Sequence, residues 1–550
     1  MSGMSGAPPL MNFSSFFSGG RFWRGKLVMV KYDAIANTKA GKLQGVQIDG
    51  IYRFLGVRYA QSTEGKNRFM PPQPLVPWEG VRPALTYAGK CWQCDTPRME
   101  DPEIRSTRYP AAYEKLMTGS NEMGVGFQSE DCLALNIWTQ GLNDGKKRPV
   151  LVWFHGGGNI AGAAEADWHD GYNIAKKENV VLVTVGHRLG IFGYLYLCDL
   201  DERFRDSANL GHQDMAAALK WIHENIEEFG GDPENVTLFG QSGGGGKVAA
   251  LMSMPMCRGM VHKAIIQSGG FHAATPEEAT AQTLDFLNFL GIDRNNVDKL
   301  YEYTAAELIQ AQREINKSRT LGTYFVCPVV KDGRVVRYDP FDGAEGSEYV
   351  KDIPLITGYT KDDAILTALF NPKIFAWDMD QLREGIMGLG YSAAQTEKII
   401  ATYKDLLGDD VRPVHIYTAL LNDRNHTRAT YERYKSRAKV GGGAPIYNYC
   451  FTREGNDPDF RAAHGVEIPF FFANAAYAPA LWNRETYHDA MKLNDSASAA
   501  WGAFARTGNP SNPGMPAWKP YEEEDRYTML IDVESKLVSR YHKEVYEFIF

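Results

Sequence analysis

Apolar residues along this chain gather in short continuous runs, and helical stretches separate the runs. A continuous β-branched run is typical of a parallel strand that is buried on both faces. Four runs have this character, at 149–154, 180–185, 236–239 and 264–266. Between the second and third run, the apolar positions of 214–226 fall on one helical face, and Gly230 ends the pattern. Strands that alternate with helices predict a doubly wound α/β sheet.

Later parts of the chain extend this pattern. The runs at 353–356 and 445–449 are predicted to be further strands of the same sheet. Roughly 275–350 and 365–440 are richer in charge and helical periodicity, which predicts helical insertions. No internal repeat and no long linker divides the chain. We therefore expect one domain over 30–550, preceded by a disordered lead-in over 1–29.

Composition limits the function classes. The chain of 550 residues is 44% hydrophobic and 23% charged, which is ordinary for a globular protein. A net charge of −8 without a basic run argues against nucleic-acid binding. No segment approaches the roughly 18 apolar residues that mark a membrane span. The N-terminus lacks a signal-peptide pattern, which favours a cytoplasmic protein, or a secreted one if a signal has been removed.

The pentapeptide Gly240-Gln241-Ser242-Gly243-Gly244 directly follows one of the predicted strands. This Gly-x-Ser-x-Gly pattern is typical of a sharp strand-to-helix turn that exposes a nucleophilic serine. Short glycine and serine patterns recur by chance, so the motif gains weight only if the partners of Ser242 exist.

A glycine run, His155-Gly156-Gly157-Gly158, follows the first central strand. Backbone N–H groups in such a loop can point at a reacting oxygen without side chains in the way. The candidate oxyanion donors are the amides of Gly157, Gly158 and Gly243. The alternative interpretation of the run is a plain tight turn.

Ser242 needs a histidine base and an acid that orients it. Among twelve histidines, His464 lies in a predicted loop after a late strand, in the segment 463–469. The chain order in this kind of fold is serine, acid, histidine, so the acid should lie between Ser242 and His464. A predicted strand ending at 360 is followed by two adjacent carboxylates, Asp362 and Asp363. The residues alone do not decide which of the two is the acid.

With these motifs in place, the chain resembles the carboxylesterase type-B family, the cholinesterase-like branch of the α/β-hydrolases. The resemblance covers roughly 30–530, and its most specific stretches are 54–60, 129–138, 229–240, 464–469 and 501–510. It implies an α/β-hydrolase fold: a mostly parallel central sheet, helices on both faces and large helical insertions. It implies a serine esterase without cofactor or metal that acts on small-molecule esters, and it leaves the oligomeric state open.

The resemblance also assigns residues. It makes Ser242 the nucleophile, His464 the base and Asp363 the acid, with Asp362 the less favoured choice. Two ion pairs are implied, Arg68 with Glu130 and Arg188 with Asp214. A disulfide between Cys91 and Cys132 is implied as well, although Cys94 could compete and a reducing compartment would keep all of them as thiols.

The chain departs from the family pattern near the nucleophile. Aspartate and alanine stand at 363 and 364 where the family has glutamate and glycine, and Gln241 stands where it has glutamate. Four glycines at 243–246 precede Lys247. The glycines either pack tightly against the sheet or widen the pocket, and the lysine is either paired or adds positive potential for an anionic acyl group. The segment between Cys94 and Cys132 contains no tryptophan, so a choline ester is an unsupported substrate.

Two other functions compete with the esterase. A lipase would carry a mobile apolar lid, and the segment 95–128 is only partly apolar. A non-catalytic adhesion protein of the same fold would usually lack a triad residue, whereas Ser242, a carboxylate and His464 are all present.

Overall fold

The computed structural model describes residues 29–94, 107–109, 126–317, 319, 325 and 327–550. The expected N-terminal lead-in over 1–29 lies, except for its last residue, outside the described residues. The segment 95–128, considered above as a lid, lies largely outside them too.

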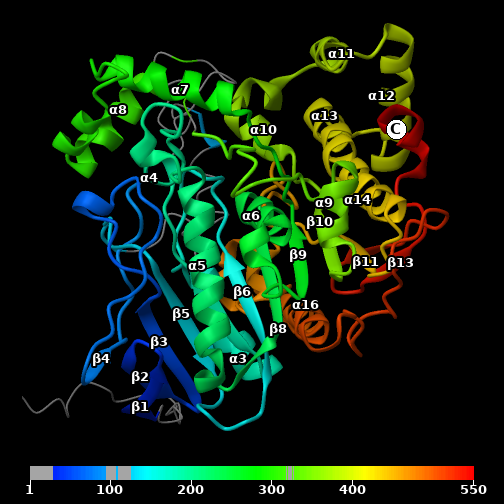
Figure 1. Ribbon diagram of the computed structural model, residues 1–550. Helices are drawn as coiled ribbons and strands as arrows, with labels where there is room; N and C mark the ends of the chain where they lie inside the picture. The colour runs from blue at the N-terminus through cyan, green and yellow to red at the C-terminus, as the bar shows by residue number, and fades with distance from the viewer. Residues whose placement is uncertain (1–28, 95–106, 110–125, 318, 320–324, 326) are drawn as a thin grey trace, which may run out of the picture.

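A 13-stranded sheet forms the centre of the molecule (Figure 1). Its strands are β1 (Val30–Thr38), β2 (Gly41–Ile48), β3 (Ile51–Arg58), β4 (Val81–Pro83), β5 (Ala134–Thr139), β6 (Arg148–Phe154), β7 (Val181–Val185), β8 (Gly231–Gln241), β9 (Lys263–Gln267), β10 (Leu355–Thr360), β11 (Ile446–Phe451), β12 (Thr528–Ile531) and β13 (Lys536–Val538). Along the sheet the order is β1-β2-β3-β5-β7-β6-β8-β9-β10-β11-β12-β13, with β4 paired to β2. Neighbours from β7 to β12 run parallel, which confirms the predicted parallel centre.

Helices cover both faces of the sheet. One face carries α5 (Leu210–Asn225) and α6 (Gly243–Ser253), and the other carries α3 (Tyr172–Glu178) and α16 (Tyr487–Thr507). Every residue of β6 is buried: Val150 and Val152 belong to the core on the α5 and α6 side, whereas Leu151 and Trp153 belong to the core on the other side. This double burial explains why the central strands are apolar at consecutive positions.

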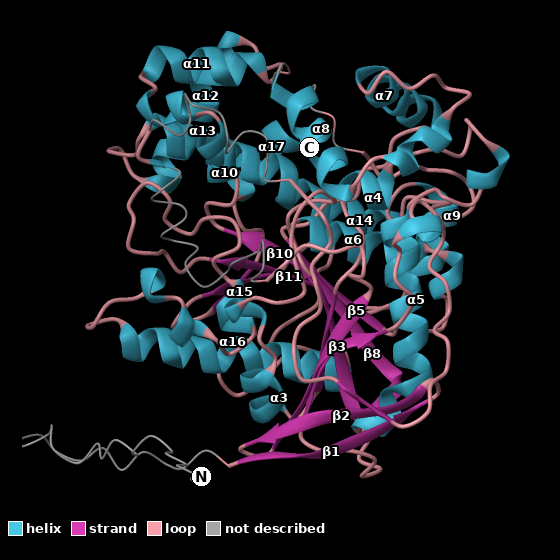
Figure 2. Cartoon of the chain, turned by 90° about the vertical axis from the view of Figure 1, so that its left-hand side faces the viewer, coloured by secondary structure: helices cyan, strands magenta, loops and turns pink. Residues whose placement is uncertain are grey.

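Long helical insertions follow β9 and β10, as predicted. The first contains α7 (Pro276–Phe289), α8 (Ala305–Lys317) and α9 (Gly343–Val350); the second contains α10 (Ile365–Phe370), α11 (Met379–Gly388), α12 (Ala393–Leu407), α13 (Pro413–Asn422) and α14 (Arg428–Lys439). The other α-helices among the described residues are the short α4 (Gly190–Tyr194), α15 (Ile468–Phe471) and α17 (Tyr546–Ile549). Most insertion helices gather at the end of the molecule opposite β1 and β2 (Figure 2).

Local sequence signals fix where several insertion helices begin. Thr275, Asp378 and Ser392 cap α7, α11 and α12, and in each case a Glu or Gln three residues later completes a capping box. None of the helices among the described residues is long and apolar enough to cross a membrane.

One strand is longer than its pattern predicts. The apolar run 236–239 is only the middle of β8, which begins at Gly231, where it pairs with Arg148 at the start of β6. The added residues include Pro233 and charged side chains, so hydrophobicity alone does not reveal them. The far end of β8 stops at Gln241, next to the predicted nucleophile.

Candidate active site

Ser242 occupies a strained turn between β8 and α6. Its φ of 58° and ψ of −125° are rare for a non-glycine residue and cost on the order of 1–3 kcal/mol. Its amide donates to the Gln267 carbonyl at 2.8 Å, which ties the turn to the end of β9. A Cβ at Gly244 would lie 2.0 Å from the Phe154 carbonyl, so glycine is required there for α6 to approach β6.

The loop after β6 lies against this turn. Gly157 and Gly158 have positive φ values of 78° and 62°. A Cβ on Gly243 would lie 2.5 Å from the Gly158 nitrogen, so the backbones of Gly158 and Gly243 are in direct contact. Among the described residues, no acceptor of the protein occupies the amides of Gly157, Gly158 and Gly243. These three N–H groups therefore have no acceptor within the described protein, and Gly243 directly follows Ser242.

His464 and Asp363 form a hydrogen-bonded pair. Nδ1 of His464 lies 2.8 Å from Oδ1 of Asp363, and both side chains are largely buried. Burial raises the pKa of Asp363, but the charges and hydrogen bonds of two imidazoles outweigh it and hold the pKa well below its usual value. Asp363 is therefore ionised at neutral pH, and His464 carries its proton on Nδ1.

Asp362 has a different set of contacts. Its Oδ2 accepts from the Ala462 amide at 3.2 Å, and its Oδ1 lies 3.4 Å from Nη1 of Arg461. Its backbone forms a β-bridge with Ala463. Asp362 thus joins the turn after β10 to the loop that carries His464, while Asp363 faces the histidine itself.

Four further side chains surround this pair. Ser268 donates to Oδ2 of Asp363 at 2.5 Å, Thr360 donates to the same oxygen at 3.1 Å, and Nε2 of His426 lies 3.2 Å from Oδ1. Burial and the charge of Asp363 raise the pKa of Glu467 to about 8, so this carboxyl is mostly protonated at neutral pH. Sequence patterns gave no signal for Ser268 or His426, because they reach Asp363 from distant parts of the chain, whereas Thr360 ends β10 just before it.

Gln241 contacts His464 directly. Its Nε2 lies 3.0 Å from Nε2 of His464, and its side chain is completely buried. Since Nδ1 of His464 holds the proton, Nε2 of the ring accepts this bond. Gln241 precedes Ser242 in the chain, so this bond ties His464 to the residue next to Ser242.

The glycines of 243–246 do not open the pocket. The places that their Cβ atoms would take are filled by the backbone of 154–158 and 267–270. The tight-packing interpretation is therefore correct, and the expectation of extra acyl space is wrong. Lys247 is also buried, and its Nζ donates to the His155 carbonyl at 2.9 Å. That bond links α6 to the loop with Gly157 and Gly158.

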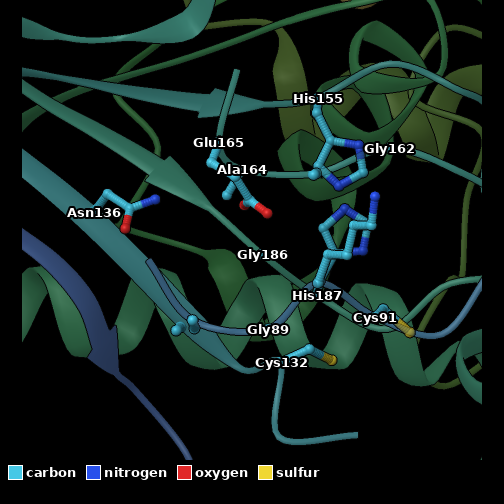
Figure 3. A pocket seen from close by; sticks show the side chains of 14 residues that line it. Gly89, Cys91, Cys132, Asn136, His155, Gly162, Ala164, Glu165, Gly186 and His187 are labelled. Carbon is cyan, nitrogen blue, oxygen red and sulfur yellow. The ribbon is translucent and has the colours of Figure 1, made fainter. Parts of the chain in front are cut away.

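A small cavity lies behind this loop (Figure 3). Its volume of about 20 Å³ has room for about one water molecule. The rings of His155 and His187 stack beside it at 4.7 Å, and burial raises the pKa of Glu165 on its wall to about 7. The cavity is too small for an ester substrate.

All seven cysteines lie within the described residues, and each is a thiol there. Cys91 and Cys132 are adjacent, and their hydrogen bond together with burial raises the pKa of Cys132. The disulfide implied by the resemblance is not formed in the structure and stays a prediction. The two implied ion pairs are present: Arg68 with Glu130 at 2.6 Å, and Arg188 with Asp214 at 2.6 Å.

The Carboxylesterase family profile matches residues 32–549 of the chain. The chain belongs to this family. Para-nitrobenzyl esterase of Bacillus subtilis is 33% identical over 91% of this chain and 95% of its own length. Phenmedipham hydrolase of Pseudarthrobacter oxydans is 30% identical, over 92% of this chain and 96% of its own length.

A solved structure agrees with these relatives. A carboxylesterase of Geobacillus stearothermophilus has a TM-score of 0.76 and 31% identity, over 93% of this chain and 98% of its own. The predicted α/β-hydrolase fold is confirmed, and the chain is a carboxylic ester hydrolase. Its substrates are small-molecule esters. Among the described residues of this carboxylesterase, no group of three or more histidine, cysteine or acidic side chains is arranged to hold a metal ion.

Proposed function

We propose that the chain cleaves carboxylic esters through an acyl-enzyme on Ser242. His464 serves as general base, Asp363 as orienting acid, and the amides of Gly157, Gly158 and Gly243 as the oxyanion hole. The main support is the 2.8 Å contact between His464 and Asp363, together with a serine held in a strained turn next to Gln241, which contacts His464.

Proton transfer and bond making would proceed together. Ser242 Oγ attacks the ester carbonyl while its proton moves to Nε2 of His464. The carbonyl oxygen becomes an anion, which the three amides would stabilise, because donors fixed before the reaction need no rearrangement when the charge forms. The bond to the alcohol then breaks, and the alcohol leaves with the proton from His464. Water repeats these steps to release the acid from Ser242.

Asp363 would fix which nitrogen of His464 takes the proton. An ionised carboxylate on Nδ1 keeps Nε2 free to act as base and stabilises the imidazolium that forms. The Ser268 and Thr360 hydroxyls on the other carboxylate oxygen restrain the carboxylate from rotating.

The first test replaces Ser242 with alanine. We expect kcat for a para-nitrophenyl ester to fall by about 10⁴- to 10⁶-fold, because the covalent route is lost while the fold remains. A fluorophosphonate probe followed by peptide mass spectrometry identifies the labelled residue. Label on any other serine would contradict the proposal.

The acid is tested in the same assay. Asp363→Asn should lower kcat by about 10⁴-fold, because an amide cannot hold His464 in the required tautomer. Asp362→Asn is the matched control and should have a much smaller effect. If Asp362→Asn were the more damaging change, the assignment of the acid would be wrong.

A further inference from the structure

The carboxylate of Asp363 is shared by two histidines. Oδ1 faces Nδ1 of His464 at 2.8 Å and Nε2 of His426 at 3.2 Å. Since Asp363 is ionised, Nε2 of His426 must carry a proton and donate it to this bond. The second imidazole therefore acts on the same oxygen that orients His464.

His426 reaches this position from an unusual piece of backbone. It lies in a π-helical turn, Asp423–Thr427, between α13 and α14. Single π-helical turns are rare and often occur at functional sites. The first and last residues of this turn are held from outside: Tyr403 donates to Asp423 at 2.8 Å, and Tyr359 shares a hydrogen bond with Thr427 at 3.0 Å.

The ring of His426 is also held in place. It stacks on the ring of Tyr359 in β10, with centroids 5.0 Å apart and planes 11° from parallel. The side chain is only 19% exposed. Asn422, at the end of α13, accepts from the Ala364 amide at 2.6 Å, so the same segment holds the turn of Asp363 from its other side. The orientation of His426 is therefore set by its surroundings rather than by the bond to Asp363 alone.

We propose that His426 is a positioning residue of the triad, whose Nε2–H holds Oδ1 of Asp363 in line with His464. This inference rests on the proposed function, because it assumes that Asp363 is the triad acid. His426 keeps its proton throughout the reaction and does not touch the substrate.

The second donor has two effects on Asp363. It fixes the direction of the carboxylate, so that the short aspartate side chain stays aimed at His464. It also takes up part of the negative charge that would otherwise stabilise protonated His464. Removing the donor should therefore lower kcat and, at the same time, raise the pKa of the base.

Other charged groups near the ring come from several elements. Asp363 follows β10, His464 follows β11, and Asp423 of the π-helical turn pairs with His542 at 3.0 Å. Burial disfavours the charged form of His542, but the pairing with Asp423 outweighs it and raises the pKa of His542. These groups are unchanged in the variants below, so shifts between variants report on His426.

The test compares His426→Phe with His426→Gln. Phenylalanine keeps a ring against Tyr359 and removes the N–H donor, whereas glutamine can restore a donor. For His426→Phe we expect kcat to fall by about 10- to 100-fold with KM nearly unchanged, as for other supporting partners of catalytic groups. The acid limb of the kcat/KM profile should move to higher pH. His426→Gln should recover most of kcat and return the limb toward that of the unchanged protein.

Asn425→Ala is the control, since Asn425 is an exposed neighbour in the same turn. It should leave kcat and the pH profile unchanged. The inference is overturned if His426→Phe leaves both unchanged, or if it lowers kcat without moving the acid limb and without rescue by glutamine.

A measurement on the unchanged protein covers the case in which His426→Phe does not fold. ¹⁵N NMR of the histidine rings should show His426 protonated on Nε2 at neutral pH. A neutral ring protonated only on Nδ1 could not donate to Asp363, and the inference would fall. Failure of the proposed function is distinct, because Ser242→Ala and Asp363→Asn would then keep their activity.

Discussion

At the scale of single residues, Gln241 contacts the ring nitrogen through which His464 would act as base. Its amide nitrogen lies 3.0 Å from Nε2 of His464, and its Oε1 has no hydrogen-bond partner among the described residues. When His464 is protonated, Nε2 becomes a donor, so the amide oxygen is the atom that would suit it. A neutral side chain that offers either atom therefore suits both protonation states of His464.

Gln241→Glu should change the pH dependence of the reaction. A carboxylate beside Nε2 stabilises the imidazolium, so the pKa of the base rises. As the pH falls, His464 therefore becomes protonated, and unable to act as a base, at a higher pH than in the unchanged protein. We expect the acid limb of kcat/KM to move upward by about one pH unit. Gln241→Met, of similar size and without charge, is the control and should not move the limb upward. An unmoved limb in Gln241→Glu would show that the carboxylate is protonated or turned away.

The residue scale also shows where sequence reasoning ends. The residues alone could not settle which of two adjacent carboxylates faces His464. Asp362 and Asp363 are the same residue type and differ only in the direction of their side chains. The structure separates them: one faces Ala462 and Arg461, the other His464. His426 could not have been found, since it lies 63 residues from Asp363 and its approach depends on one π-helical turn.

At the scale of elements, the start of α6 and the loop after β6 behave as one unit. Gly158 and Gly243 are in backbone contact, and Lys247 of α6 bonds the carbonyl of His155. The strands and insertions were predictable because apolar runs and helical periodicity are local signals. The close contact between α6 and the loop was not, because a run of glycines is equally consistent with open space.

Gly243→Ala should damage catalysis more than folding. The new Cβ would lie 2.4 Å from Cα of Gly158, so the loop must move and its amides lose their alignment. We expect kcat to fall by about 10²- to 10³-fold, the range for loss of one oxyanion donor. Gly270→Ala is the matched control, since nothing lies within 4 Å of its Cβ position. Full activity in Gly243→Ala would exclude Gly158 from the oxyanion hole.

At the scale of the whole molecule, a buried ion pair joins distant parts of the chain. Arg188 follows β7, Asp214 lies in α5, and their side chains are 1% and 0% exposed. Arg188 also donates to the Met70 carbonyl at 2.8 Å. The pair thus holds together the N-terminal region, the loop after β7 and the helix that covers the sheet.

Asp214→Asn should lower the global stability. It leaves the charge of Arg188 buried without a counter-ion, which typically costs about 3–5 kcal/mol in the free energy of unfolding. Chemical denaturation measures this change. The control is Asp201→Asn, whose partner Arg203 is exposed, and its effect should be too small to detect. Equal stability of Asp214→Asn and the unchanged protein would show that water reaches Arg188.

The bridge between Asp362 and Ala463 has a consequence for how such a protein can evolve. The proposed acid and base are 101 residues apart in the chain, yet backbone pairing joins the turn of one to the loop of the other. Helices α10 to α14 lie between Asp363 and the start of β11, outside this bridge, so insertions and deletions among them need not move the pair. Selection can then reshape the second insertion while the chemistry is retained. Position 426 is the exception, because there a change of one residue in helix length would break the contact with the acid.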